Sequence, residues 1–261
     1  MVSGVATATV QYALQEDVAY VTLNAPPLNI LSAGMMLELA DAVSRAQAEP
    51  TAKALVFQAQ SGSRAFSAGA DVGEHRPENA AVMIAAFSRL FAALGASELP
   101  IVAAVDGAAL GAGFELAIMA DILLASDRAK FGQPEIRLGF FAPVAVAWLA
   151  RRIGIARAVE VTSTGRTYTA AEMRDFGLVS RVVTTAELPG TLEATLTDIR
   201  CASAAVIRMN VRLTRQLADR PFSEAHREAE RVFLSDLMAT DDVREGIASF
   251  FEKRPPVWKN R

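Results

Sequence analysis

The feature of this chain that most constrains its fold is the order of its expected secondary-structure elements. A strand, a turn and a helix recur three times before residue 130. We expect strands at 18–23, 54–59, 101–105 and 122–126, and helices at 33–48, 80–97 and 113–120. Strands that alternate with helices favour crossover connections between strands of one sheet. The order therefore predicts an α/β fold.

Local signals support these boundaries. Glu16-Asp17 interrupts two strand-like runs within residues 6–24 and predicts a hairpin turn. Ser32 precedes the first helix as an expected N-cap. Thr169 and Glu172 have the spacing of a capping box.

The chain becomes mainly helical after Thr169. We expect helices at 186–200, 202–218, 223–238 and 241–253. No low-complexity linker separates the two parts. We therefore predict one core over residues 1–195, which holds the site, and a C-terminal helical region over residues 196–261.

Composition limits the classes of function. The net charge of −3 gives no electrostatic basis for binding nucleic acid or an anionic membrane surface. The apolar fraction of 52% exceeds that of a usual soluble domain, and we interpret the excess as surface buried in part between subunits. One cysteine excludes an internal disulfide framework and fits a reducing compartment. With no signal peptide expected and no apolar run long enough to span a bilayer, we predict a cytoplasmic protein.

Two glutamates occupy positions that are costly for a carboxylate. Glu115 lies inside the apolar run 108–120, and Glu135 follows Phe131-Gly-Gln-Pro and precedes Ile136. A carboxylate in apolar surroundings is costly unless it is paired, hydrogen-bonded or used chemically. The two residues are therefore candidates for acid–base catalysis.

Two loops of small residues could bring backbone amides to a ligand. They are residues 66–71 and residues 107–113, and the second leads into a helix. Small side chains allow close approach, and a helix start offers free N–H groups. We predict an oxyanion hole formed by the N–H groups of Ala68 and Ala112, which would polarise a thioester or another carbonyl.

Plainer interpretations remain for each feature. Glu115 could complement a helix dipole, and Glu135 could pair with Arg137. His75 could line the mouth of the site or occupy an ordinary loop position. We find no metal-ligand spacing of histidines or cysteines, and no phosphate-binding loop or dinucleotide fingerprint.

Motifs along nearly the whole chain resemble the crotonase (enoyl-CoA hydratase/isomerase) superfamily. They are Phe66-Ser-Ala-Gly-Ala-Asp71, Asp106-Gly-Ala-Ala-Leu-Gly-Ala-Gly-Phe-Glu-Leu-Ala117, Ala129-Lys-Phe-Gly-Gln-Pro-Glu-Ile-Arg-Leu-Gly139, Gly177-Leu-Val179, Glu245-Gly246 and Phe251-Glu-Lys-Arg254. The resemblance implies a spiral of ββα units, a C-terminal helical trimerisation region, and a homotrimer or dimer of trimers.

The resemblance also implies an acyl-CoA thioester substrate, with coenzyme A as part of the substrate and no separate cofactor or metal. It assigns the oxyanion hole to Ala68 and Ala112 and the two hydratase carboxylates to Glu115 and Glu135. Glu115 would orient and deprotonate water, and Glu135 would protonate the substrate carbon.

Further contacts are implied for coenzyme A and for the acyl group. Coenzyme A would contact Ala68, Ala70 and Asp71, with Phe250 and Lys253 reaching it from a neighbouring subunit.

The usual Pro-Gly-Ala-Gly-Gly-Thr segment of the family is replaced here by residues 140–148, so the acyl pocket should differ in shape. We expect that pocket to contain His75, Phe140, Phe141, Val144 and Trp148.

The reaction class has one leading interpretation and several alternatives. Two carboxylates favour an acyl-CoA hydratase or dehydratase, and the variant segment with Glu74-His-Arg-Pro77 resembles the hydratases of cyclic dienoyl-CoA in anaerobic aromatic degradation. The alternatives are a branched-chain or glutaconyl-CoA hydratase, a double-bond isomerase, a serine peptidase using Ser67 and His75, and a silent CoA-binding protein.

Overall fold

A computed structural model describes residues 8–261 of the chain, and two sheets organise it. The larger sheet contains, in spatial order, β1 (Val10–Gln15), β2 (Val18–Leu23), β3 (Ala54–Ala59), β5 (Ile101–Val105), β7 (Ile122–Ser126) and β10 (Arg181–Val183). Only β1 runs antiparallel to its neighbour, and the other strands are parallel. This arrangement confirms the predicted α/β class.

The second sheet is made of strands that follow those of the first sheet along the chain. It contains, in spatial order, β4 (Ala65–Ser67), β6 (Ala108–Leu110), β8 (Lys130–Gly132) and β9 (Thr167–Thr169). Each of β3, β5 and β7 is thus followed by a short strand of this second sheet, and the chain then returns through helical structure to the first. The repeated unit is the predicted ββα turn of a spiral, although the second-sheet strands themselves were not expected.

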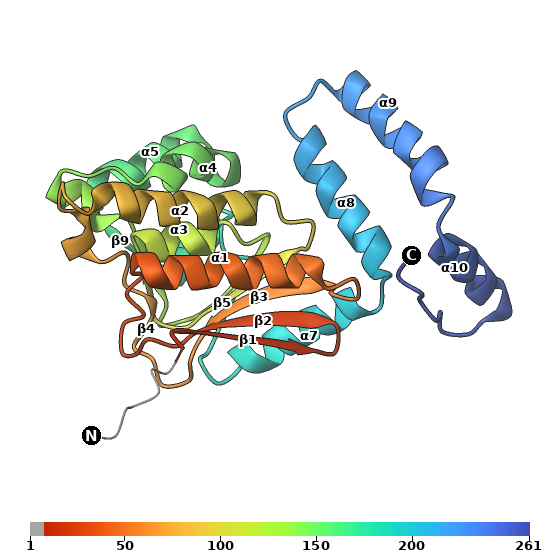
Figure 1. Cartoon of the computed structure of the whole chain (residues 1–261), viewed down its shortest axis with the longest axis horizontal. Helices are drawn as coiled ribbons and strands as arrows, with labels where there is room; N and C mark the ends of the chain where they lie inside the picture. The colour runs from red at the N-terminus through yellow and green to blue at the C-terminus, as the bar shows by residue number, and fades with distance from the viewer. Residues whose placement is uncertain (1–7) are drawn as a thin grey trace.

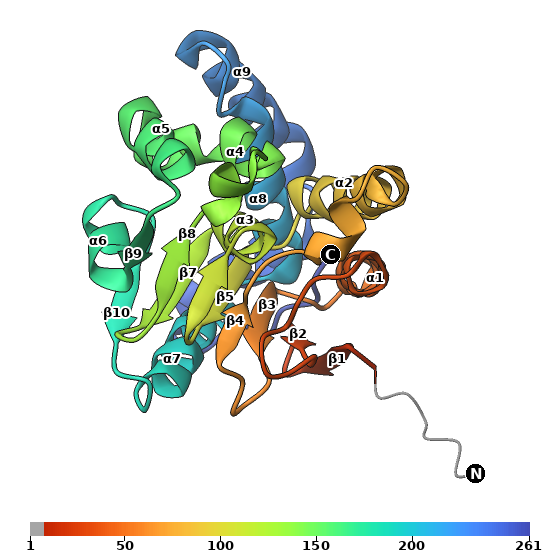
Figure 2. The same cartoon turned by 90° about the vertical axis from the view of Figure 1, so that its left-hand side faces the viewer.

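Helices cover both faces of the larger sheet (Figures 1 and 2). On one face lie α1 (Ala33–Ala48), α2 (Ala80–Gly95) and α3 (Ala112–Ile118), and on the other lies α7 (Leu188–Arg200). Successive residues of β3 therefore enter different cores: Leu55 and Phe57 face the first group, and Val56 faces α7. A parallel sheet buried on both faces accounts for the continuous apolar runs in the sequence.

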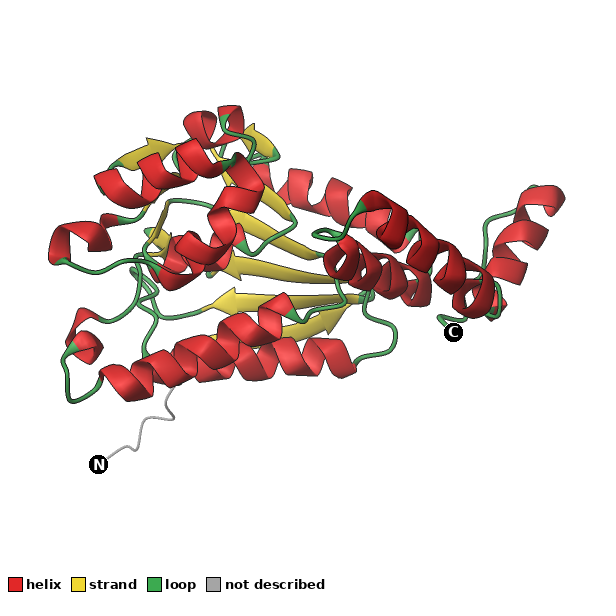
Figure 3. Cartoon of the chain, turned by 90° about the horizontal axis from the view of Figure 1, so that it is seen from above, coloured by secondary structure: helices red, strands yellow, loops and turns green. Residues whose placement is uncertain are grey.

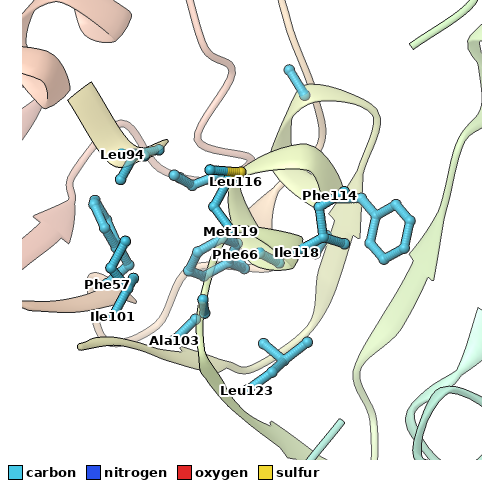
Figure 4. Close-up of a cluster of buried hydrophobic side chains, with 14 of the residues drawn as sticks. Phe57, Phe66, Leu94, Ile101, Ala103, Phe114, Leu116, Ile118, Met119 and Leu123 are labelled. Atoms are coloured by element: carbon cyan, nitrogen blue, oxygen red, sulfur yellow. The ribbon is translucent and has the colours of Figure 1, made fainter. Parts of the chain in front are cut away.

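The short helix α3 lies in the middle of the main core. All seven of its residues are buried. Phe114, Leu116 and Ile118 pack among side chains of the strands and of α2 (Figure 4). Glu115 is consequently carried on an element that has no solvent-exposed face, which sets the unusual electrostatics of the site.

The helices between β8 and β10 were not all predicted. The chain forms α4 (Pro143–Ile153) and α5 (Ile155–Thr164), which were not expected, and then α6 (Ala170–Asp175) with the expected Thr169–Glu172 capping box. Two short 3-10 helices, η1 (Val72–His75) and η2 (Pro134–Leu138), border the site. The expected Ser32 cap and the turn at Glu16 and Asp17 are confirmed.

The C-terminal helices extend away from the sheets (Figures 1 and 3). They are α8 (Ala204–Leu217), α9 (Phe222–Val232) with a π-helical continuation over Phe233–Leu237, and α10 (Asp241–Glu252). The boundary proposed after residue 195 falls within α7 and stays a prediction. Within residues 8–261, no helix is long and apolar enough to cross a bilayer.

Arginines attach α8 to the core by binding the C-terminal ends of helices. Arg208 donates to the carbonyls of Gln47 at 3.1 Å and Glu49 at 2.6 Å, at the end of α1. Arg215 donates to the carbonyls of Leu94 and Ser97, at the end of α2. Cations are favourable where helix carbonyls lack partners. Arg208 and Arg215 therefore anchor α8 to the core.

Candidate active site

A cavity of about 560 Å³ opens between the two small-residue loops and the two 3-10 helices. Its wall is mainly apolar and includes Met83 and Phe87 of α2 together with Phe140 and Phe141 after η2. The polar side chains along it are those of His75, Glu115, Glu135 and Arg137. Apolar pockets with a few convergent polar groups are the usual form of a small-molecule site.

Glu115 is a buried residue of α3, and its carboxyl group lies against the N-terminal end of α4. Its side chain is 2% exposed. Its Oε1 accepts hydrogen bonds from the backbone N–H groups of Val144 at 2.7 Å and Ala145 at 3.0 Å, in the first turn of α4. Burial raises the pKa of Glu115 to about 8, the two amides oppose this rise, and the nearby Glu135 adds to it.

Glu135 reaches the same cavity from η2. With its amide nitrogen facing the carboxylate, Gln133 donates to Oε2 at 2.9 Å and to Oε1 at 3.0 Å. This orientation is assigned from the hydrogen bonds that it satisfies. Burial also raises the pKa of Glu135, while a charged His75 would lower it. Gln133 is almost fully buried and therefore holds the carboxylate in a fixed position.

Gly111 allows the two carboxylates to share one space. A Cβ on this residue would lie 2.5 Å from Oε1 of Glu135, and its φ of +55° also disfavours a side chain. The Gly111 carbonyl accepts the N–H of Glu115 at 2.9 Å, which places Glu115 one helical turn after Gly111. The two acids thus face one cavity from η2 and α3.

The expected donor Ala68 is wrong, because its N–H already donates to the carbonyl of Leu28 at 2.9 Å. Two residues later, the N–H of Ala70 has no protein acceptor within residues 8–261, and the same is true of the N–H of Ala112 at the start of α3. Ala70 and Ala112 both line the cavity. The pair of free amides is therefore Ala70 and Ala112.

The two loops that carry these amides approach each other closely. A Cβ on Gly69 would lie 3.1 Å from the carbonyl oxygen of Leu110 and 3.8 Å from the nitrogen of Ala112. Gly69 also has a φ of +112°. A side chain on residue 69 would push the two loops apart. Glycine is therefore required at this position if the N–H groups of Ala70 and Ala112 are to lie close together.

His75 is held at the cavity wall by η1. Its Nδ1 lies 2.9 Å from the carbonyl oxygen of Asp71, and its ring centroid is 5.1 Å from that of Phe140. A carbonyl oxygen only accepts hydrogen bonds, so Nδ1 carries the proton and Nε2 is left free. Asp71 caps η1 by accepting the Gly73 N–H at 2.7 Å and does not line the cavity.

Some predicted pocket residues lie elsewhere. Val144 serves Glu115 through its backbone N–H and does not line the cavity. Trp148 also does not line it, because the register of α4 turns this half-buried ring toward the core, with Arg151 over it at 5.2 Å.

Helix α10, which carries Phe250 and is followed directly by Lys253, lies at the opposite end of the molecule from α2 and α3 (Figure 1). These two residues cannot reach the cavity of their own chain.

Ser67 is unsuited to act as a nucleophile. It is fully buried, and its hydroxyl accepts the N–H of Gly69 at 3.2 Å. The serine peptidase interpretation therefore lacks an accessible hydroxyl group.

Gln133 was missed from the sequence, although one signal was available. A polar residue two positions before Glu135 points to the same side if the segment is extended, and the residue sits between Gly132 and Pro134. The apolar wall from α2, formed by Met83, Ile84 and Phe87, was also missed. Its residues follow the core-facing spacing of a helix and give no separate sign of a site.

The fold and this site define the class of protein as an α/β enzyme with a crotonase-type spiral. The family model "Enoyl-CoA hydratase/isomerase" matches residues 13–261. A crystal structure of an enoyl-CoA hydratase from Mycobacterium smegmatis superposes with a TM-score of 0.89 at 28% identity, covering 97% of this chain and 99% of that one.

Curated relatives agree with the family match. A probable enoyl-CoA hydratase of Mycobacterium bovis is 39% identical over 249 residues, covering 94% of this chain and 96% of its own length. Cyclohexa-1,5-dienecarbonyl-CoA hydratase of Thauera aromatica is 35% identical over 238 residues, covering 90% of each chain. The chain belongs to the enoyl-CoA hydratase/isomerase family, whose members act on acyl-CoA thioesters.

Proposed function

We propose that this protein adds water across the α,β double bond of an enoyl-CoA thioester and catalyses the reverse dehydration. The observation that carries the proposal is the pair of carboxyl groups, the buried Glu115 and the half-buried Glu135, facing one cavity beside two free amides. An isomerase needs to move only one proton between carbons. A second acid–base group is what water addition requires.

The free amides of Ala70 and Ala112 would bind the thioester oxygen. Negative charge develops on this oxygen when the nucleophile attacks the β-carbon, and each well-placed donor is worth about 3 kcal/mol in such a transition state. Neither donor has to give up a protein partner first, because both are free among the described residues. The enolate would therefore form in a preorganised site.

The two carboxyl groups would share one proton. Both have raised pKa values because the buried Glu115 and the half-buried Glu135 are partly shielded from water, and the charge of Glu135 disfavours ionisation of Glu115. Hydration requires the proton on Glu135, so that Glu115 can accept a proton from water while Glu135 protonates the α-carbon. Dehydration requires the opposite distribution. The chain's own carboxyl groups supply this chemistry, and coenzyme A enters as part of the substrate.

A cyclic dienoyl-CoA is the acyl group that we propose. Phe140 and Phe141 stand at the cavity wall where family members usually have small residues, and flat aromatic walls suit a planar ring. The 35% identity to the Thauera aromatica hydratase supports the same substrate class. Branched enoyl-CoA and glutaconyl-CoA are the alternatives within this reaction.

We propose a homotrimer or a dimer of trimers in the cytoplasm. Several large apolar side chains of the C-terminal helices are exposed in the single chain, among them Phe222, Leu234, Phe250 and Phe251. Exposed apolar patches of this kind are typical of protein interfaces. Burial in an assembly would also bring Phe250 and Lys253 to another subunit's coenzyme A.

The test measures the loss of conjugated thioester absorbance on a panel of crotonyl-CoA, cyclohexa-1,5-dienecarbonyl-CoA, a branched enoyl-CoA and glutaconyl-CoA. We expect fastest turnover on the cyclic dienoyl thioester. Glu135→Gln should lose most turnover and still bind coenzyme A, whereas Glu230→Gln, on the exposed surface of α9, should behave like the wild type. No turnover on any member of the panel would reject the proposed function.

A further inference from the structure

Among the described residues that line the cavity, the proposed reaction leaves His75 and Arg137 unused, and of these two only the imidazole readily exchanges a proton. It lies at the wall between the apolar interior and the exposed η1 loop, half-buried, with Nε2 unpartnered within residues 8–261. The Nδ1 hydrogen bond to Asp71 and the contact with Phe140 fix its ring. A fixed imidazole with one free nitrogen can accept or release a proton at a defined place.

The short segment from Glu135 to Phe140 connects the carboxyl group of Glu135 to the imidazole of His75. Phe140, which contacts the His75 ring, donates its backbone N–H to the Glu135 carbonyl at 3.1 Å. The positive charge of a protonated His75 would favour the ionised form of Glu135, so the two groups interact. A change in the protonation of one therefore alters the other.

The proposed reaction leaves the two acids in the wrong protonation state for another turnover. During hydration an O–H bond of water breaks, the oxygen bonds to the β-carbon, and the proton passes to Glu115. The proton of Glu135 forms the new bond to the α-carbon. Glu115 then holds a proton and Glu135 is ionised, so Glu135 must gain one proton and Glu115 must release one before the next cycle.

Few groups around the cavity can transfer the proton that Glu135 needs. Among the described residues, the charged side chains that line the cavity with His75 are Glu115, Glu135 and Arg137. Its own loop adds Asp71, Glu74 and the exposed Arg76. A guanidinium group does not give up its proton in proteins, so an arginine cannot serve as the relay. Glu74 is occupied because it accepts the N–H of Ala33 at 2.7 Å, and Asp71 caps η1. The facing residues of α2 are apolar.

We propose that His75 relays protons between solvent and Glu135. After each hydration the imidazolium would give its proton to Glu135 and take another from solvent, while Glu115 releases its proton to water entering the emptied cavity. In dehydration the same steps run in reverse. This inference rests on the proposed hydratase function and adds a proton-transfer residue that acts through Glu135.

The experiment measures kcat and KM for hydration in weakly buffered solution, with and without added imidazole. His75→Gln keeps an N–H donor for the Asp71 carbonyl and cannot carry a proton. We expect its kcat to fall about 10-fold or more with KM within about twofold of the wild type. Imidazole should restore kcat in a saturable manner, while the wild type should be insensitive to imidazole.

Two further variants separate relay from packing. His226→Gln changes the other histidine of the chain, which lies exposed on α9, and should match the wild type. His75→Met fills the cavity wall with an apolar side chain and should show the same loss and the same rescue as His75→Gln.

Unchanged kcat in both His75 variants, a loss that imidazole does not restore, or failure of both to fold would overturn the relay. Failure of the wild type to hydrate any substrate would instead reject the proposed function.

Discussion

The protonation of Glu115 should be visible in the stability of the protein. Burial raises its pKa from the ordinary 4.5 to about 8. Between these values the folded chain keeps the proton and the unfolded chain releases it, so the free energy of unfolding falls as pH rises. At ~1.4 kcal/mol per pKa unit, the ionised carboxylate costs the folded state about 5 kcal/mol above this range.

Glu115→Gln should remove this cost. The glutamine amide oxygen can accept the N–H groups of Val144 and Ala145, as the protonated acid does, and it cannot ionise. The variant should gain stability relative to the wild type as pH rises. Between about pH 5.5 and about pH 7.5 the difference in unfolding free energy should grow by about 3 kcal/mol.

Urea denaturation of both proteins at equal concentration over this pH range measures the difference, provided that the denaturant slopes agree. Glu187→Gln is the control, because hydrogen bonds from Thr184 lower the pKa of Glu187 below its ordinary 4.5. Glu187 is then ionised in both the folded and the unfolded state across this range, so its difference in unfolding free energy should not vary with pH. A Glu115→Gln difference that does not vary with pH would refute the assignment of a retained proton to Glu115.

Three other substitutions test the geometry of the site and of the C-terminal region. Gly111→Ala places a Cβ 2.5 Å from Oε1 of Glu135. We expect the displaced carboxyl group to lower kcat about 100-fold. A near-normal kcat would contradict the close approach of Gly111 and Glu135. Gln133→Leu removes both donors to Glu135, so the pH profile of kcat/KM should move upward by about one unit, and an unmoved profile would exclude the hydrogen bonds. Asp242→Asn weakens a buried group that accepts from Ser203 Oγ at 2.5 Å, Lys259 N at 2.6 Å and Asn260 N at 2.8 Å. It should lower the unfolding free energy by about 1–3 kcal/mol in denaturation, and an unchanged value would show that this anchor of the C-terminus is dispensable.

The larger sheet could be predicted from the sequence because its strands are buried on both faces and give apolar runs, such as Ile101–Val105. The strands of the second sheet could not. Each spans three residues and is defined by pairing with distant segments, as in Ala108 with Lys130 and Phe131 with Tyr168. Nothing local distinguishes such a segment from a loop.

The candidate catalytic carboxylates could also be predicted from the sequence, because their signal is local. Glu115 interrupts an apolar run, and this contrast lies within a few residues of sequence. The choice between Ala68 and Ala70 depends on a hydrogen bond that the Ala68 N–H donates to the carbonyl of Leu28, some forty residues away, and no local pattern reveals which amide is already occupied. The position of Trp148 likewise depends on the register of a helix whose start was not recognised.

The most direct test of the central claim follows the fate of solvent oxygen. Purified protein is incubated with the best enoyl-CoA substrate in oxygen-18 water, and the acyl product is analysed by mass spectrometry. Two carboxyl groups that add water predict one labelled oxygen in the product, and loss of labelling when Glu115→Gln and Glu135→Gln are combined. An unlabelled double-bond isomer, or labelling that persists in the double variant, would contradict the account.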